Sequence, residues 1–99
     1  MPVSLQVIYP ASAGSRFDHE YYAGTHLPMV SSHLGSHLSS VLVTKGASSA
    51  PTYHAIATMV FEDQDALDAA MEAAQPVLED IPNFTDVKAE ILLGEVIVS

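Results

Sequence analysis

Cysteine is absent from this 99-residue chain, and lysine and arginine together account for only three residues. Without cysteine the chain can form no disulfide, no zinc–thiolate site and no thiol nucleophile. Twelve carboxylates oppose Arg16, Lys45 and Lys88, so the net charge is -9. That balance argues against binding to nucleic acid or to anionic membranes, and against strongly anionic substrates, although a local pocket can oppose the overall field.

Long apolar runs are also missing. No stretch approaches the roughly 18 apolar residues of a membrane span, and no basic segment followed by an apolar run comes after Met1. We therefore expect no transmembrane segment, no export signal and a cytoplasmic location, with which the lack of cysteine is compatible. Hydrophobic residues make up 48% of the sequence, enough for one core but not for two, so residues 1–99 are expected to form a single domain.

Hydrophobic periodicity divides the chain into six segments. Alternating apolar residues indicate strands, and apolar residues three or four apart indicate helices. The expected elements are strand 3–9, helix 18–34, strand 41–45, strand 53–62, helix 63–78 with a kink or end at Pro76, and strand 87–98 with a bend at Gly94. This order predicts a ferredoxin-like βαββαβ α+β fold with an antiparallel sheet. Asp18 and Asp63 are expected to cap the helices, and Gly35 to take the left-handed position after the first one.

The strand expected at residues 53–62 carries apolar side chains on both faces. An antiparallel sheet usually leaves one face in water, so burial of both faces requires a second covering layer. In so small a domain, a partner subunit is the simplest source of that layer. His54 falls on the second face, where we expect it to lie in the subunit contact with a structural role.

Residues 17–30, F-D-H-E-Y-Y-A-G-T-H-L-P-M-V, concentrate the polar aromatic groups of the chain. On a helix that starts at residue 18, one inward arc contains Tyr22, His26, Met29 and His33, and Tyr21 lies on the flank. Pro28 removes its own backbone hydrogen bond and crowds the carbonyl four residues before it. We therefore expect a kink or break in the helix two residues from the histidine.

His26 is the first candidate for chemistry, because histidine takes up and releases protons near neutral pH. Tyr22 and Tyr21 are candidates to assist it, and Tyr9 stands at a strand end nearby. The alternative is structural: the imidazole would donate to the carbonyl freed by Pro28, and the tyrosines would pack the core with satisfied hydroxyls. A tight metal site from His26, His33 and His37 is not expected, because the helix should end between the last two.

Small side chains in the strand at residues 53–62 leave room for a ligand. Ala55 and Ala57 stand where bulk would normally fill the core, and we expect an apolar pocket beneath Tyr22 and His26. Its other lining residues would be Met29, Met59 and Phe61. Small residues also allow close helix approach, which is the alternative interpretation of the same pattern.

Three segments together carry a family resemblance: Tyr9-Pro10 with the F-D-H-E-Y-Y-A-G-T-H-L-P-M-V stretch, then H-A-I-A-T-M-V-F-E-D, then D-I-P-N-F-T-D. The chain resembles the EthD family, named for ethyl tert-butyl ether degradation, over nearly its whole length. Met29 stands where leucine is more familiar, which should keep the apolar contact. The resemblance implies a homodimer in which two ferredoxin-like sheets close into a dimeric α/β barrel with the helices outside.

Fold relatives of such proteins span several activities, so the fold alone does not choose the reaction. We expect an enzyme that binds a small apolar carbonyl or phenolic compound between the first helix and the sheet. Acid/base catalysis by His26, assisted by Tyr22 or Tyr21, would support isomerisation, cyclisation or oxygenation without a bound cofactor. The alternatives are a non-catalytic small-molecule-binding or accessory dimeric protein and, less favoured, a haem-linked oxidoreductase.

Overall fold

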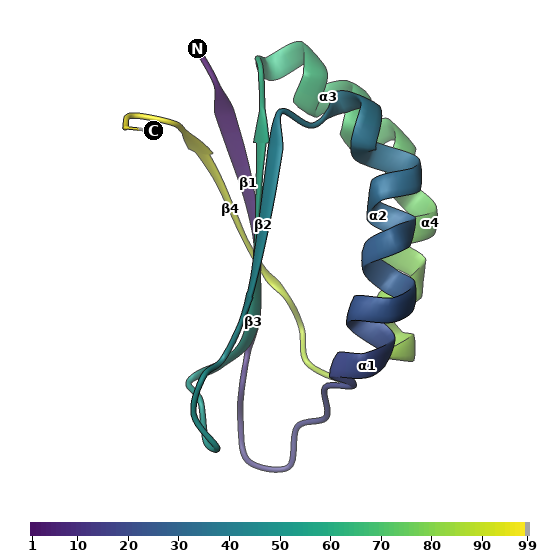
Figure 1. Cartoon of the computed structure of the whole chain (residues 1–99), viewed down its shortest axis with the longest axis vertical. Helices are drawn as coiled ribbons and strands as arrows, with labels where there is room; N and C mark the ends of the chain where they lie inside the picture. Colours follow the sequence, from purple (N-terminus) through teal and green to yellow (C-terminus); the bar gives the residue numbers. More distant parts are fainter. Residues whose placement is uncertain (99) are drawn as a thin grey trace.

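A four-stranded antiparallel sheet forms one layer of the protein, seen in a computed structural model that describes residues 1–98 (Figure 1). Its strands are β1 (Val3–Pro10), β2 (Ser40–Lys45), β3 (Tyr53–Phe61) and β4 (Glu90–Glu95), in the spatial order β2-β3-β1-β4. This is the ferredoxin-like order, and the predicted α+β class is confirmed. Within the described part of the chain, no helix is long and apolar enough to cross a membrane.

The helical layer covers only one face of the sheet (Figure 1). It consists of α1 (His19–Tyr21), the π-helical turn η1 (Tyr22–His26), α2 (Leu27–Leu34), the 3-10 turn η2 (Gly35–His37), α3 (Gln64–Ala73), α4 (Gln75–Asp80) and the 3-10 turn η3 (Ile81–Asn83). Alternate residues of β3 are buried beneath these helices: Ala55, Ala57, Met59 and Phe61. The residues between them are half-buried on the uncovered face, so residues 1–98 supply no second covering layer and the partner subunit stays a prediction.

Two clusters of buried side chains fill the space between the layers. The main core cluster joins the sheet to α2, α3 and α4 and is almost wholly aliphatic; it contains Leu5, Val30, Leu34, Ala57, Met59, Phe61, Leu67, Ala70, Ala74 and Val77. The aromatic cluster contains Tyr9, Tyr22, Ala55 and Phe84, with Phe17 and Tyr21 packed against it. Since Tyr22 precedes Val30 on the same helical run, the two clusters lie end to end along that run.

Pro28 is accommodated by a π-helical turn rather than by a break. The Asp18 carboxylate caps the helix start by accepting from the Tyr21 amide at 3.1 Å, as predicted. In the turn that follows, the Leu27 N–H bonds to the Tyr22 carbonyl, one residue further back than in an α-helix. That extra residue moves the inward face by one position, so Val30 and Leu34 are buried. The prediction that His33 faces inward is therefore wrong; it is exposed.

Two predicted features near the ends of elements differ in the structure, and a third is confirmed. Gly35 is right-handed with φ -56° and leads into a 3-10 turn, so its predicted left-handed conformation is wrong. Gly94 pairs with Ser4 in unbroken register, so no bend interrupts β4, which begins only at Glu90. The second helix divides as predicted: Asp63 caps α3, accepting from the Ala66 amide at 2.9 Å, and Pro76 lies in the first turn of α4.

Candidate functional site

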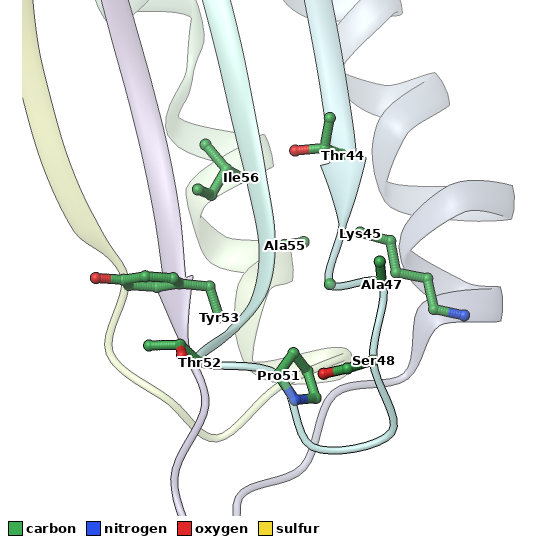
Figure 2. Close-up of a pocket in the computed structure, with 10 residues that line it drawn as sticks. Thr44, Lys45, Ala47, Ser48, Pro51, Thr52, Tyr53, Ala55 and Ile56 are labelled. Carbon is green, nitrogen blue, oxygen red and sulfur yellow. The ribbon is translucent and has the colours of Figure 1, made fainter.

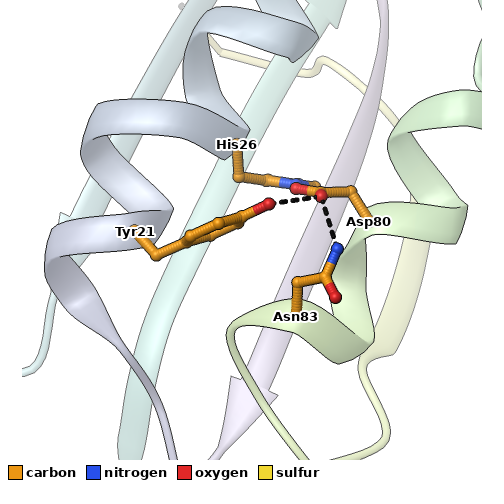
Figure 3. Close-up of polar contacts among 4 residues, drawn as sticks. All are labelled: Tyr21, His26, Asp80 and Asn83. Atoms are coloured by element: carbon orange, nitrogen blue, oxygen red, sulfur yellow. Dashed lines mark hydrogen bonds and ion pairs between the residues drawn. The ribbon is translucent and has the colours of Figure 1, made fainter.

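Asp80, the last residue of α4, is the centre of a polar network that joins four helical segments (Figure 3). Its Oδ1 accepts from the Tyr21 hydroxyl at 2.7 Å and from the Asn83 amide at 3.0 Å. Its Oδ2 lies 3.0 Å from His26 Nδ1. Asp80 is 7% exposed and His26 3% exposed, so the pair is held in the protein interior.

The hydrogen bonds keep Asp80 ionised. Burial alone would raise the pKa of its carboxyl group, but the bonds from Tyr21, Asn83 and His26 outweigh burial and hold that pKa below its ordinary value. The same contact raises the pKa of the Tyr21 hydroxyl, because an ionised tyrosine could not donate to the carboxylate. A carboxylate at Nδ1 places the ring proton on that nitrogen, which leaves Nε2 of a neutral His26 as the proton acceptor.

Aromatic rings enclose the His26 imidazole on two sides. The Tyr22 ring stacks on it with centroids 5.6 Å apart and an interplanar angle of 18°, and the Phe84 ring lies 4.5 Å away at 55°. Burial raises the pKa of the Tyr22 hydroxyl to about 12. Burial also raises the pKa of Tyr9, with a smaller contribution from Tyr22. Both hydroxyls therefore stay protonated near neutral pH and can act as hydrogen-bond donors.

The structure brings together His26, Tyr22 and Tyr21, the three residues predicted for catalysis, and gives them different surroundings. Tyr22 contacts the imidazole through its ring, whereas Tyr21 reaches the site through its bond to Asp80. Within residues 1–98, the network shows no hydrogen bond at His26 Nε2. The structural alternative, a bond from the imidazole to a backbone carbonyl, is not what the structure shows: His26 Nδ1 bonds Asp80, which lies 54 residues further along the chain.

The residues predicted to bind substrate are divided between the two clusters. Tyr9 and Ala55 belong to the aromatic cluster, and Ala57, Met59 and Phe61 belong to the main core cluster, against which Met29 packs half-buried. Two open grooves lie elsewhere. One, of about 380 Å³, is at the β2–β3 hairpin and is lined partly by Ala55 (Figure 2). The other, of about 480 Å³, lies beside residues 12–15.

His54 lies on the helix-covered side, so its predicted position on the opposite face is wrong. Tyr9 pairs with Ala55 but Pro10 pairs with Tyr53, which leaves His54 as an extra residue in β3. Such a bulge turns the side chain out of the strict alternation of a strand. The His54 ring stacks on Phe17 with centroids 5.3 Å apart, and its Nε2 lies 2.8 Å from the Ser15 hydroxyl.

Sequence reasoning missed Asp80, Asn83 and Phe84, because D-I-P-N-F-T-D was used only as one segment of the family resemblance, with no role assigned to its side chains. One local signal was present. A carboxylate at the C-terminal end of a helix opposes the helix dipole, so Asp80 needs a compensating partner elsewhere. The identity of that partner has no local signature. Among the described residues, no group of three or more histidine, aspartate or glutamate side chains is arranged to hold a metal ion.

Comparisons with known proteins agree with this architecture. A sequence profile of the EthD domain matches residues 14–88. An EthD-like protein from Ralstonia eutropha is 36% identical, with a TM-score of 0.86 over 99% of this chain and 94% of its own. An ethyl tert-butyl ether degradation family protein from Bacillus halodurans is 22% identical, with a TM-score of 0.74 over 98% of this chain and 100% of its own.

A third solved structure shares the fold at much lower sequence identity. SnoaB, a cofactor-independent oxygenase from Streptomyces nogalater, is 10% identical, with a TM-score of 0.69 over 99% of this chain and 94% of its own. No curated protein matches the sequence.

Proposed function

The chain belongs to the EthD family, and from that premise we propose that it is a small-molecule enzyme in which His26 performs acid/base chemistry without a bound cofactor. The observation that carries the proposal is the buried Asp80–His26 pair, with Nδ1 held 3.0 Å from the carboxylate. A carboxylate at one imidazole nitrogen fixes the ring orientation and stabilises the imidazolium that forms when the other nitrogen takes a proton. The shared fold with SnoaB supports the oxygenase class but does not select it.

The proposed reaction is proton transfer next to a carbonyl group, or from the hydroxyl of an activated phenol. His26 Nε2 takes the proton, and Asp80 balances the positive charge on the ring. Tyr22, whose pKa is raised to about 12 by burial, can donate a hydrogen bond to the substrate oxygen on which negative charge develops. Tyr21 is a positioning residue, because its hydroxyl bonds Asp80 at 2.7 Å and helps to hold that carboxylate in place.

The substrate is proposed to bind between η1 and the sheet, where the aromatic cluster supplies an apolar surface. Tyr9 and Ala55 line that surface from the strands, and Tyr22 lines it from the helix. Since His26 is only 3% exposed, substrate binding requires the rings around it to move apart. A π-helical turn is a common feature of functional sites, and it lies here between Tyr22 and His26.

Solvent deuterium exchange tests the proposal for carbonyl compounds, because removal of the carbon-bound proton by His26 is detected whichever product forms afterwards. Small ketones and diketones would be incubated with the protein in D₂O, and loss of the proton next to the carbonyl, above the rate without protein, would be followed by NMR. His26→Gln should slow exchange by at least about 100-fold, the usual contribution of a general base. His33→Gln is the matched control, because His33 is an exposed histidine on α2. Exchange that is equally fast in His26→Gln would contradict the proposal.

A second candidate function is favoured by the depth of burial. The same Asp80–His26 pair joins η1 to α4 and could serve only to hold the helical layer together, in a non-catalytic small-molecule-binding or accessory protein. In that case, His26→Gln lowers the melting temperature but wild type exchanges none of the test compounds. If wild type exchanges a test compound and His26→Gln does not, this second candidate function is rejected.

We also propose that two copies of the chain form a homodimer through the uncovered face of the sheet. Leu42 and Leu92 lie on that face and are 66% and 53% exposed in the single chain. Light scattering should give twice the 10.5 kDa chain mass. Leu92→Asp should shift the protein to monomer, whereas Leu78→Asp, on the outer side of α4 and 46% exposed, should not.

A further inference from the structure

Three side chains that can carry positive charge lie close together: His19 on α1, Lys45 on β2 and His54 on β3, with Lys45 and His54 both near enough for their charges to act on His19. The His19 and His54 rings both contact the Phe17 ring, at 4.6 Å and 5.3 Å, and are 6.4 Å from each other. Lys45 lies opposite Ala55, a residue buried beneath the helices. Figure 2 shows its ammonium group extending to the side where the helix runs, with Tyr53 pointing the other way.

This gathering is unusual for a chain with twelve carboxylates and three basic residues. Among residues 1–98, Asp80 and His26 form the one close contact between a carboxylate and a basic side chain that the structure shows, so no carboxylate pairs with Lys45. The Lys45 side chain also lines the open hairpin groove of about 380 Å³, so its charge is accessible to a ligand. An unpaired lysine beside two imidazoles is a local positive field that opposes the overall charge.

The contacts of His54 show how its ring is held. The Ser15 hydroxyl donates to the Ser12 carbonyl at 2.7 Å, so its single proton is used there. The 2.8 Å contact between Ser15 Oγ and His54 Nε2 is then a bond donated by the imidazole.

The electrostatics of His19 show that the charges of these groups act on one another. Burial is the largest cause that lowers its pKa, the charges of Lys45 and His54 lower it further, and Asp18 opposes them by raising it. A ligand carboxylate among these groups would offset the repulsion between them.

We propose that His19, Lys45 and His54 form a binding site for the carboxylate of a small monoanionic substrate. The inference deepens the proposed function and rests on it, because it names the charged group of the molecule on which His26 acts. Phe17 links the two sites: its ring lies 5.0 Å from Tyr22, and Tyr22 stacks on His26. An apolar carboxylic acid could therefore hold its carboxylate at this site while its body crosses the aromatic cluster towards His26.

Benzoate and benzamide are suitable probes, because they share size and shape and differ in charge. Binding would be followed by NMR titration at constant ionic strength, with the resonances of the His19 and His54 rings as reporters. Benzoate should bind wild type about fivefold more tightly than benzamide, the scale of one accessible charge pair. Benzoate should also raise the pKa of His19, because it counters Lys45 and His54.

Lys45→Gln is the decisive variant, and Lys88→Gln is its control, because it removes the same charge from a lysine near the other groove. Lys45→Gln should remove the preference for benzoate and leave benzamide binding unchanged, while Lys88→Gln should behave as wild type. Equal binding of the two probes, equal effects of the two variants, or no saturable benzoate binding would each overturn the proposal.

The outcome for this site is separable from the outcome for His26. A protein that prefers benzoate but keeps full deuterium exchange in His26→Gln has the anion site without the proposed chemistry. A protein that loses exchange in His26→Gln but does not distinguish benzoate from benzamide keeps the chemistry and loses the anion site.

Discussion

The main core cluster and the aromatic cluster lie beneath the same helices on the same face of the sheet, yet they bury different groups. In the main core cluster every buried member is apolar, from Leu5 to Val77. The aromatic cluster instead packs around the buried Asp80 carboxylate and the His26 ring bonded to it, and two of its own members are tyrosines with raised pKa values. Buried charge costs stability unless it is paired and hydrogen-bonded. The difference therefore separates a region that mainly stabilises the fold from the region in which we propose that proton transfer takes place.

The largest expected effect compares two phenylalanines that are both 0% exposed, one in each cluster. Phe61→Ala and Phe84→Ala should each lower the free energy of unfolding by about 3–5 kcal/mol, measured by urea denaturation. Only Phe84→Ala should also change the ring resonances of His26, because the Phe84 ring lies 4.5 Å from it. The two Phe→Leu variants replace these if the alanine variants do not fold. If Phe61→Ala changed the His26 ring resonances as much as Phe84→Ala, the two clusters would not be separate.

Alkaline pH should act mainly through the aromatic cluster. In the unfolded chain Tyr22 ionises near its ordinary pKa of about 10, whereas in the folded protein burial raises that pKa to about 12. The stabilisation that comes from the raised Tyr22 pKa is complete below pH 10. It is lost as the pH rises through the folded-state pKa, and the loss amounts to at most about 2.7 kcal/mol. Tyr22→Phe should reduce this loss in denaturation series from pH 9 to 12.

Tyr53→Phe provides the control for that series, because Tyr53 is 42% exposed and lies outside both clusters. It should reproduce the wild-type curve. If Tyr53→Phe reduced the alkaline loss as much as Tyr22→Phe, burial in the aromatic cluster would not be its cause.

Acidic pH should act through Asp80. Its folded pKa is lowered by three hydrogen-bond donors against the effect of burial. Its contribution is therefore present above the ordinary carboxyl pKa of about 3.9 and is lost as the pH falls through the folded value. Asp80→Asn should lower stability at pH 7 by about 1–3 kcal/mol and flatten the acid limb of the stability curve. Glu72→Gln, which removes an exposed charge from α3, should change stability by less than about 0.5 kcal/mol.

The smallest effect compares two helix caps that make the same contact. Asp18 accepts from the Tyr21 amide at 3.1 Å, and Asp63 accepts from the Ala66 amide at 2.9 Å. Asp18→Ala and Asp63→Ala should each cost about 1 kcal/mol. Since Tyr21 also bonds Asp80, only Asp18→Ala should alter deuterium exchange of a substrate. An unaltered exchange rate in Asp18→Ala would show that Tyr21 keeps its position without the Asp18 cap.

The features that were predictable from the sequence depend on neighbours along the chain. Alternation in residues 53–62, the caps at Asp18 and Asp63, and the interruption at Pro76 follow from backbone geometry and hydrogen bonding within a few residues. They were enough to order the elements and to predict the antiparallel sheet. The prediction of an irregular helix around Pro28 was also correct in position, because the missing N–H of a proline affects residues close to it in the sequence.

The features that were not predictable depend on where such local rules are relaxed. One additional residue in the π-helical turn replaced His33 by Leu34 on the inward face, and one additional residue in β3 moved His54 to the helix-covered side. Each change is a shift of one position, which periodicity alone cannot anticipate because both alternatives fit the same pattern.

By itself, the sequence determined that this is a small acidic α+β domain in which His26 and two tyrosines share one helical run. Only the tertiary structure decided that Asp80 would be the partner of His26, and that His19, Lys45 and His54 would lie close together. The reason is physical. Elements form through interactions between residues close in sequence, whereas a site needs side chains from several elements at hydrogen-bonding distance, and that distance exists only after the helices have packed on the sheet.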